Sequence, residues 1–175
     1  MSVIIYFDNE NQTKDRCAGQ AYYNFLDYAF SKTDYFMLVY VNYYGKGYSK
    51  ETKRIMNDLS TFKVKSRTNP SWPGTLNTYT KNTTYKIVFY RNTNEGKEIL
   101  KQVKCLSDWT CPAYPQDLAF FKGGECWFYS VGHEKIGAII GATEEDFIFL
   151  ELNNLAKRSD ARPTNNYYRA FNEKL

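Results

Sequence analysis

The stretch YFMLVYVNYY, residues 35–44, decides the fold that the sequence predicts. It is too apolar and too rich in β-branched and aromatic residues to be a helix on the protein surface. Its apolar run continues through Val41, which is typical of a central strand that is covered on both faces. The glycines of Gly45-Lys46-Gly47 end this strand.

Upstream of residues 35–44, the sequence predicts one strand and one helix. Residues 2–7 are apolar and rich in β-branched side chains, and Asp8-Asn9 follows them, which indicates a short buried strand. From about Thr13 to Phe30, apolar residues recur at three- and four-residue steps. This spacing places them on one stripe of an amphipathic helix. The Thr13 hydroxyl is suited to cap its first turn.

Downstream, periodicity and turn residues predict three more helices and five more strands. The helices run from Ser49 to about Leu59, from Glu95 to Leu106 with Asn94 as cap, and from Thr143 to about Leu155. The strands lie at residues 62–67, 85–91, 118–121, 126–131 and 136–140. Gly123-Gly124 indicates a hairpin turn between two of them.

Strands and helices alternate in the first half of the chain, whereas hairpins dominate the second half. This order predicts an α+β fold, a mixed β-sheet with about four helices packed on it. Two helical crossovers would pair early strands in parallel, and the late hairpins are antiparallel. A chain of 175 residues suits one compact domain. We assign residues 1–156 to that domain and 157–175 to a polar tail, either docked or flexible.

Positive charge is concentrated between Tyr43 and Arg91. This part has ten Lys and Arg residues and two acidic residues, which gives +8 within a chain whose net charge is +4. Flat rings alternate with these cations, at Tyr43, Tyr44, Tyr48, Trp72, Tyr79, Tyr85 and Tyr90. Interleaved cations and rings favour binding of something anionic.

Two predicted elements give this charge a geometry. Lys50, Lys53 and Arg54 are three or four residues apart on a helix and form one ridge. In the alternating strand that follows, Lys63, Lys65 and Arg67 project as a row. The predicted binding residues are Lys46, Lys50, Lys53, Arg54, Lys63, Lys65, Arg67, Trp72 and Tyr79.

A proline-containing loop presents Trp72, which we expect to be exposed. Asn69-Pro70 and Pro73-Gly74 flank this tryptophan and are turn signals. Because proline restricts the backbone, such a loop loses less entropy on binding.

The partner predicted from these features is a nucleic acid, a nucleotide or an acidic protein surface. Backbone amides of Gly45-Lys46-Gly47, just before a helix, offer a second way to hold an anion. An alternative is an inhibitor or immunity-type protein, from a phage or mobile element, that blocks a nucleic-acid-processing host or defence protein. Size and charge are the only basis for that alternative.

Catalytic signatures are sparse, and the sequence favours a protein that is not an enzyme. The candidate catalytic residues are Cys126, His133 and Glu134. A thiolate and an imidazole facing each other across a hairpin would form a nucleophile, which leaves an unusual enzyme as an alternative. Adjacent residues of an extended segment point to opposite faces, so His133 and Glu134 are not expected to cooperate.

The remaining signals concern cofactors and location. One histidine and four scattered cysteines give no recognised metal-ligand spacing, and no cofactor-binding motif is present. The first residues lack the basic and apolar regions of a secretion signal, and no apolar run approaches the ~18 residues of a membrane span. We therefore expect a cytoplasmic protein with reduced cysteines and no membrane partner. Oligomeric state is not predicted.

Overall fold

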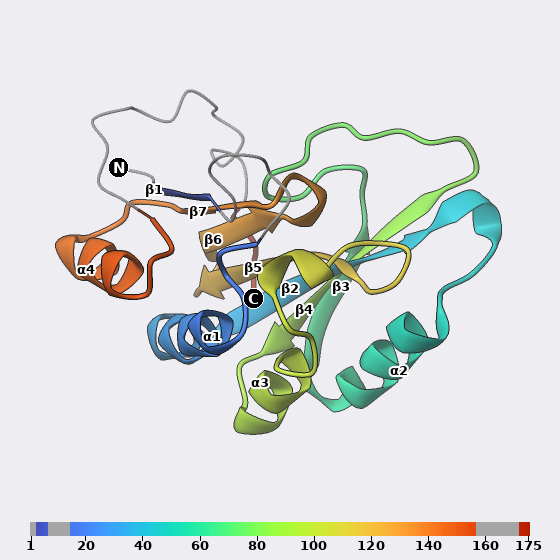
Figure 1. The fold of residues 1–175 in the computed structure, drawn as a ribbon. Helices are drawn as coiled ribbons and strands as arrows, with labels where there is room; N and C mark the ends of the chain where they lie inside the picture. The colour runs from blue at the N-terminus through green and yellow to red at the C-terminus, as the bar shows by residue number, and fades with distance from the viewer. Residues whose placement is uncertain (1–2, 7–14, 157–171) are drawn as a thin grey trace.

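The computed structural model describes residues 3–6, 15–156 and 172–175 (Figure 1). It contains a seven-stranded sheet in the order β1-β7-β6-β5-β2-β4-β3 and four α-helices. The predicted α+β class, the single compact domain and the number of helices are confirmed. Most of the predicted tail, residues 157–171, lies outside the described residues.

The central strand of the prediction is confirmed. β2 (Tyr35–Asn42) lies between β4 and β5 and is buried at every position except its two ends. The other strands are β1 (Val3–Tyr6), β3 (Lys63–Thr68), β4 (Thr84–Arg91), β5 (Gln116–Lys122), β6 (Glu125–Val131) and β7 (Ile136–Ile139).

Every pair of neighbouring strands among the described residues is antiparallel. The prediction of a mixed sheet is therefore wrong. Both early crossovers do connect strands that run in the same direction. In each case another strand inserts between them: β4 separates β2 from β3, and β2 separates β4 from β5. Each inserted strand is antiparallel to both neighbours, a pairing slightly more stable per residue than the parallel one.

The helices are α1 (Gln20–Lys32), α2 (Lys50–Asp58), α3 (Asn94–Leu100) and α4 (Glu144–Leu152). The predicted start of α2 is confirmed, because the Ser49 hydroxyl accepts a hydrogen bond from the Thr52 amide at 3.0 Å. The predicted capping box of α4 is confirmed as well, between Thr143 and Asp146.

Two helices are shorter than predicted. α1 begins at Gln20, after Gly19 with φ of 58°, and the predicted cap Thr13 lies outside the described residues. Residues 17–19 instead pair with residues 104–106, and this pairing also ends α3 before Leu106. Thr93, not Asn94, caps α3. Backbone pairing between distant segments here outweighs local helix periodicity.

The sheet has two differently covered faces. All four helices pack on one face, here called the helix face, where Phe25 and Leu150 meet Phe120 of β5. The opposite face, here called the loop face, is covered by Trp72 and Leu175. This two-sided cover explains why β2 is apolar at successive positions.

The end of the chain lies against the loop face. The Glu173 amide donates to the Gly124 carbonyl at 2.7 Å, and Asn172 bridges to Glu125. A Cβ atom at Gly124 would lie 1.9 Å from the Glu173 carbonyl oxygen. The predicted hairpin glycine is therefore also what lets residues 172–175 approach the sheet.

Candidate binding surface

The basic ridge predicted on α2 is present, but one of its three cations is paired with carboxylates. Lys50 and Lys53 are exposed on the outer side of the helix, while Ile55 is buried against the helix face. Arg54 instead pairs with carboxylates of its own helix, Glu51 at 2.7 Å and Asp58 at 3.6 Å. Lys50 and Lys53 are the two cations of the ridge that remain available.

Two of the three cations in the row predicted on β3 share one carboxylate. Lys65 Nζ lies 2.9 Å from one Glu173 oxygen, and Arg67 Nη2 lies 2.7 Å from the other. The Glu173 side chain is only 9% exposed. Lys63 remains exposed at the start of the strand.

Lys65 and Arg67 lie on the face of the sheet opposite the ridge, whereas Lys63 is paired with Tyr90 of the helix-face cluster. Lys65 and Arg67 are directly opposite Phe89 and Ile87, whose side chains belong to the loop-face cluster. Directly opposed residues share a face, whereas α2 covers the helix face. The expectation of one continuous basic surface is therefore wrong, because Lys65 and Arg67 point to the loop face, where residues 172–175 pack against them.

The expectation that Trp72 is exposed is also wrong. Its side chain is 1% exposed, and its Nε1 donates to Asp117 Oδ2 at 2.8 Å. The indole packs beside Tyr85, with ring centres 5.3 Å apart. An indole buries much apolar area while its N–H finds one acceptor, and this is how Trp72 closes the loop face.

Trp72 also fixes the loop that carries Tyr79. Backbone hydrogen bonds of 2.9 Å run both ways between Trp72 and Thr75. Gly74 between them has φ of 89°, and a Cβ atom there would lie 2.8 Å from the Tyr129 ring. Beyond this turn, Leu76 is 43% and Tyr79 is 85% exposed. The exposed aromatic of this loop is Tyr79.

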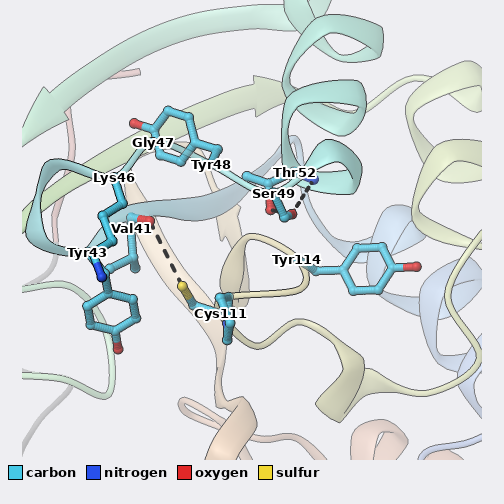
Figure 2. Close-up of a pocket in the computed structure, with 10 residues that line it drawn as sticks. Val41, Tyr43, Lys46, Gly47, Tyr48, Ser49, Thr52, Cys111 and Tyr114 are labelled. Atoms are coloured by element: carbon cyan, nitrogen blue, oxygen red, sulfur yellow. Dashed lines mark hydrogen bonds between the residues drawn. The ribbon is translucent and has the colours of Figure 1, made fainter.

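A pair of adjoining hollows lies where β2 ends. The first has a volume of about 180 Å³ and is framed by Tyr43, Lys46 and Tyr48 on one side and by Cys111 and Tyr114 on the other (Figure 2). The second has a volume of about 240 Å³ and shares Tyr43 and Cys111 with the first. Tyr43 therefore stands where the hollows meet.

The segment 110–115 supplies one wall of these hollows, and the sequence analysis did not identify it. The Ser49 hydroxyl donates to the Ala113 carbonyl at 2.8 Å, which ties the start of α2 to this segment. Cys111 Sγ lies 3.9 Å from the Val41 carbonyl oxygen. Burial raises the pKa of Cys111 to about 11. No sequence pattern links residues 43–52 with residues 110–115, so only the tertiary structure reveals this wall.

Two exposed rings lie next to each other here: Tyr43 lines both hollows, and Tyr44 follows it in the chain. Tyr44 is 59% exposed, and its ring centre lies 6.2 Å from that of Tyr43. Lys46 Nζ lies 5.9 Å from the centre of the Tyr44 ring. Tyr44 has φ of 52°, a left-handed conformation that is unusual for a bulky residue. Its amide donates to the Thr83 hydroxyl at 3.2 Å.

Two of the three amides predicted to hold an anion are already bonded. The Lys46 amide donates to the Tyr43 carbonyl at 2.9 Å, and the Gly47 amide donates to Asn42 Oδ1 at 2.7 Å. The Ser49 hydroxyl caps the first turn of α2. An anion bound here would therefore be held mainly by side chains.

The candidate catalytic residues are not brought together. Cys126 is buried in the loop-face cluster, and its Sγ donates to the Phe128 carbonyl at 3.4 Å. Burial raises the pKa of this thiol well above its usual value, which disfavours the thiolate. His133 lies beyond the far end of β6, where it is exposed.

His133 and Glu134 do approach each other, contrary to the expectation that they point to opposite faces. His133 Nε2 lies 3.7 Å from Glu134 Oε1. The reason is that both belong to the 3₁₀ turn η4 (Gly132–Glu134) rather than to an extended strand. Both side chains are more than half exposed, so this pair is a weak surface contact.

Among the residues that the structure describes, no three His, Cys, Asp or Glu side chains gather as metal ligands would. No helix in this described part combines the length and apolar character needed to cross a bilayer. No family model, curated protein or solved structure matches the chain. Its function therefore has to be inferred from its surface.

Proposed function

We propose that the protein is a non-enzymatic binding protein that engages an anionic partner through residues 43–53, here called the tyrosine–lysine segment. One observation supports this most directly. Lys46, Lys50 and Lys53 are all exposed, and none pairs with a carboxylate of the described residues. Of the other predicted cations, Arg54, Lys65 and Arg67 are paired, and Lys63 is exposed.

The difference between paired and unpaired cations matters for binding. A partner that approaches Lys65 or Arg67 has to compete with Glu173, which is already desolvated beside them. A partner that approaches Lys50 or Lys53 displaces only water and counterions, and counterion release favours binding.

The partner is a nucleic acid, a nucleotide or an acidic protein surface, and the proposal places the protein in the cytoplasm. The four cysteines are free thiols. Free thiols are typical of proteins in a reducing compartment.

Charge reversal on the ridge tests the proposal. Lys50→Glu with Lys53→Glu should weaken binding to a polyanion such as inorganic polyphosphate. Loss of two phosphate contacts on a single strand corresponds to about 25-fold at 0.1 M salt, and charge reversal should exceed this. Binding is measured by competition for a labelled polyanion at several salt concentrations.

A matched control separates position from net charge. Lys104→Glu with Lys122→Glu makes the same change of charge at two exposed lysines on other parts of the molecule. Its binding should fall much less. Equal losses in the two double variants would mean that only net charge matters, and the proposed surface would be wrong.

A second candidate function is an inhibitor or immunity-type protein that binds a protein partner. Tyr79, at 85% exposed, and Leu76 favour it, because tyrosine often anchors protein interfaces. The bonded turn at Trp72 holds their loop before binding, which lowers the entropy lost. Tyr79→Ala should then abolish capture of one host protein and leave polyanion binding unchanged. Unchanged capture would exclude this loop as the anchor.

A further inference from the structure

We infer that the anionic partner is a single-stranded nucleic acid, whose bases lie against Tyr43 and Tyr44 while its phosphates lie along Lys46, Lys50 and Lys53. This inference rests on the proposed function and names the chemical class of the partner. Three observations support it: the hollows beside Tyr43, the exposed rings, and the fact that the free cations are lysines.

The hollows suit flat rings that enter one at a time. Volumes of about 180 and 240 Å³ are each below the usual range of a small-molecule site, and only the two together reach it. An extended chain with one ring per unit can use adjoining hollows of this kind. A duplex keeps its bases stacked inside and cannot place them there.

Aromatic walls in the hollows would stack on a base. Tyr43 borders both hollows and is 37% exposed, and Tyr44 beside it is more exposed still. Burial raises the pKa of Tyr43 and of Tyr48 above the usual value, so both phenols remain neutral at physiological pH. Neutral hydroxyls donate hydrogen bonds to an anion instead of repelling it.

The conformation of Tyr44 is informative about its role. With φ of 52°, this position would suit glycine better than tyrosine, because a Cβ atom strains a left-handed backbone. The ring contributes little to the core at this exposure. A strained residue whose side chain projects into solvent is expected where that side chain contacts a ligand.

The free cations of the proposed surface are lysines. Arginine forks make bidentate contacts with carboxylates and phosphates alike, but Arg54 is held by Glu51 and Arg67 by Glu173. The tyrosine–lysine segment offers lysines, whose point charges follow a phosphate backbone without fixed geometry. The carboxylate side chains of an acidic protein surface carry no ring to fill the hollows.

Polar groups in the second hollow suit base edges. Thr78, Thr80 and Gln116 line it, and His133 stands at its border. Hydroxyl and amide groups both donate and accept hydrogen bonds, as the edges of different bases require. These hydroxyl and amide groups can bond to several different bases, so binding does not require one nucleotide sequence.

Three polyanions distinguish the classes of partner. The probes are an eight-nucleotide oligothymidylate, the duplex that it forms with oligoadenylate, and polyglutamate. The duplex carries twice as many phosphates as the single strand, so charge alone would favour the duplex. Fluorescence anisotropy at low salt should show the tightest binding for the single strand. Tighter or equal binding of polyglutamate would overturn the inference in favour of an acidic protein, and a preference for the duplex would overturn it as well.

Tyr44→Gly gives the sharper result, because glycine suits the backbone and the variant should fold. Loss of one stacking ring should weaken oligothymidylate binding by about 5- to 150-fold. Polyglutamate binding should not change. Tyr44→Phe should keep most of the affinity, and Leu152→Ala, at an exposed apolar residue of α4, should keep all of it. Equal oligothymidylate binding by Tyr44→Gly and the unchanged protein would refute the stacking role.

The two proposals fail in different ways. If all three polyanions bind with equal affinity and the ridge variant Lys50→Glu with Lys53→Glu weakens all of them, the lysine surface stands and the single-strand inference is wrong. If the ridge variant matches its Lys104 and Lys122 control on every probe, the proposed function is wrong.

Discussion

Two parts of the positive region each combine cations with aromatic residues, but the structure places them in opposite environments. The tyrosine–lysine segment keeps Lys46, Lys50 and Lys53 unpaired and exposes Tyr43 and Tyr44. Residues 63–72, here called the strand–loop segment, pair Lys65 and Arg67 with Glu173 and bury Trp72 on Asp117. Cations and rings serve as a surface in the first segment and as internal support in the second.

This difference shows that charge density along a chain does not measure available charge. Glu173 lies more than a hundred residues from Lys65 and Arg67 in sequence and still pairs with both. We therefore expect substitutions in the strand–loop segment to change stability, and those in the tyrosine–lysine segment to change binding.

The largest expected effect is on stability, from Trp72→Ala. Removal of a fully buried indole should cost about 3–5 kcal/mol of the free energy of unfolding, and it takes away one donor to the buried Asp117 carboxylate, which also accepts from the Gly132 amide and from Gln116. Chemical denaturation measures the change. Tyr79→Ala, in the same loop, should change it by less than about 0.5 kcal/mol. Similar losses in the two variants would mean that Trp72 does not hold the loop.

The next effect is on binding, from the combined substitutions Lys46→Gln, Lys50→Gln and Lys53→Gln. Three lost phosphate contacts should reduce the salt dependence of log affinity for a single strand by about 2, which is about 100-fold at 0.1 M salt. A salt titration of oligothymidylate binding measures it. Glutamine at Lys104, Lys122 and Lys174, three other exposed lysines, should leave the slope nearly unchanged.

A smaller effect on stability is expected from Glu173→Gln. The amide removes the negative charge from between Lys65 and Arg67, and charged hydrogen bonds contribute about 1.5–3 kcal/mol when fully buried. Because both cations are partly exposed, we expect a loss of about 1–2 kcal/mol. Thermal and chemical unfolding measure it, with Lys50→Gln as control. A loss no larger than that of the control would mean that the docked chain end contributes little.

The smallest expected effect concerns the alkylation of two cysteines, Cys111 in the hollows and Cys126 in the core. Because burial raises the pKa of Cys111 to about 11, its alkylation rate should increase with pH until about pH 11. Cys126 should react only after unfolding, since it is buried. Mass spectrometry of the alkylated protein follows each site. Reaction of Cys126 in the folded protein at neutral pH would contradict its burial.

Local patterns predicted most of the elements. The apolar run of β2, the Ser49 cap of α2 and the Thr143 box of α4 each depend on neighbouring residues, and each was correct. The ends of α1 and α3 were wrong, because residues 17–19 bond to residues 104–106. Pairing between such distant segments has no local signal.

The candidate surface was predicted only in part. Helical spacing correctly placed Lys50 and Lys53 on one exposed side of α2. Strand alternation gave the side chains of Lys65 and Arg67 a common direction, but it could not say whether that direction led to solvent. Trp72 had a similar ambiguity, because an indole beside prolines suits either an exposed loop tip or a buried anchor.

The sequence by itself determined the α+β class, the central strand and the excess of positive charge in residues 43–91, because these depend on composition and on short-range periodicity. The tertiary structure alone decided which charges remain available, because that depends on where Glu173 and residues 110–115 come to lie. Ion pairs and hollows form between segments distant in the chain, so their geometry exists only once the sheet has assembled.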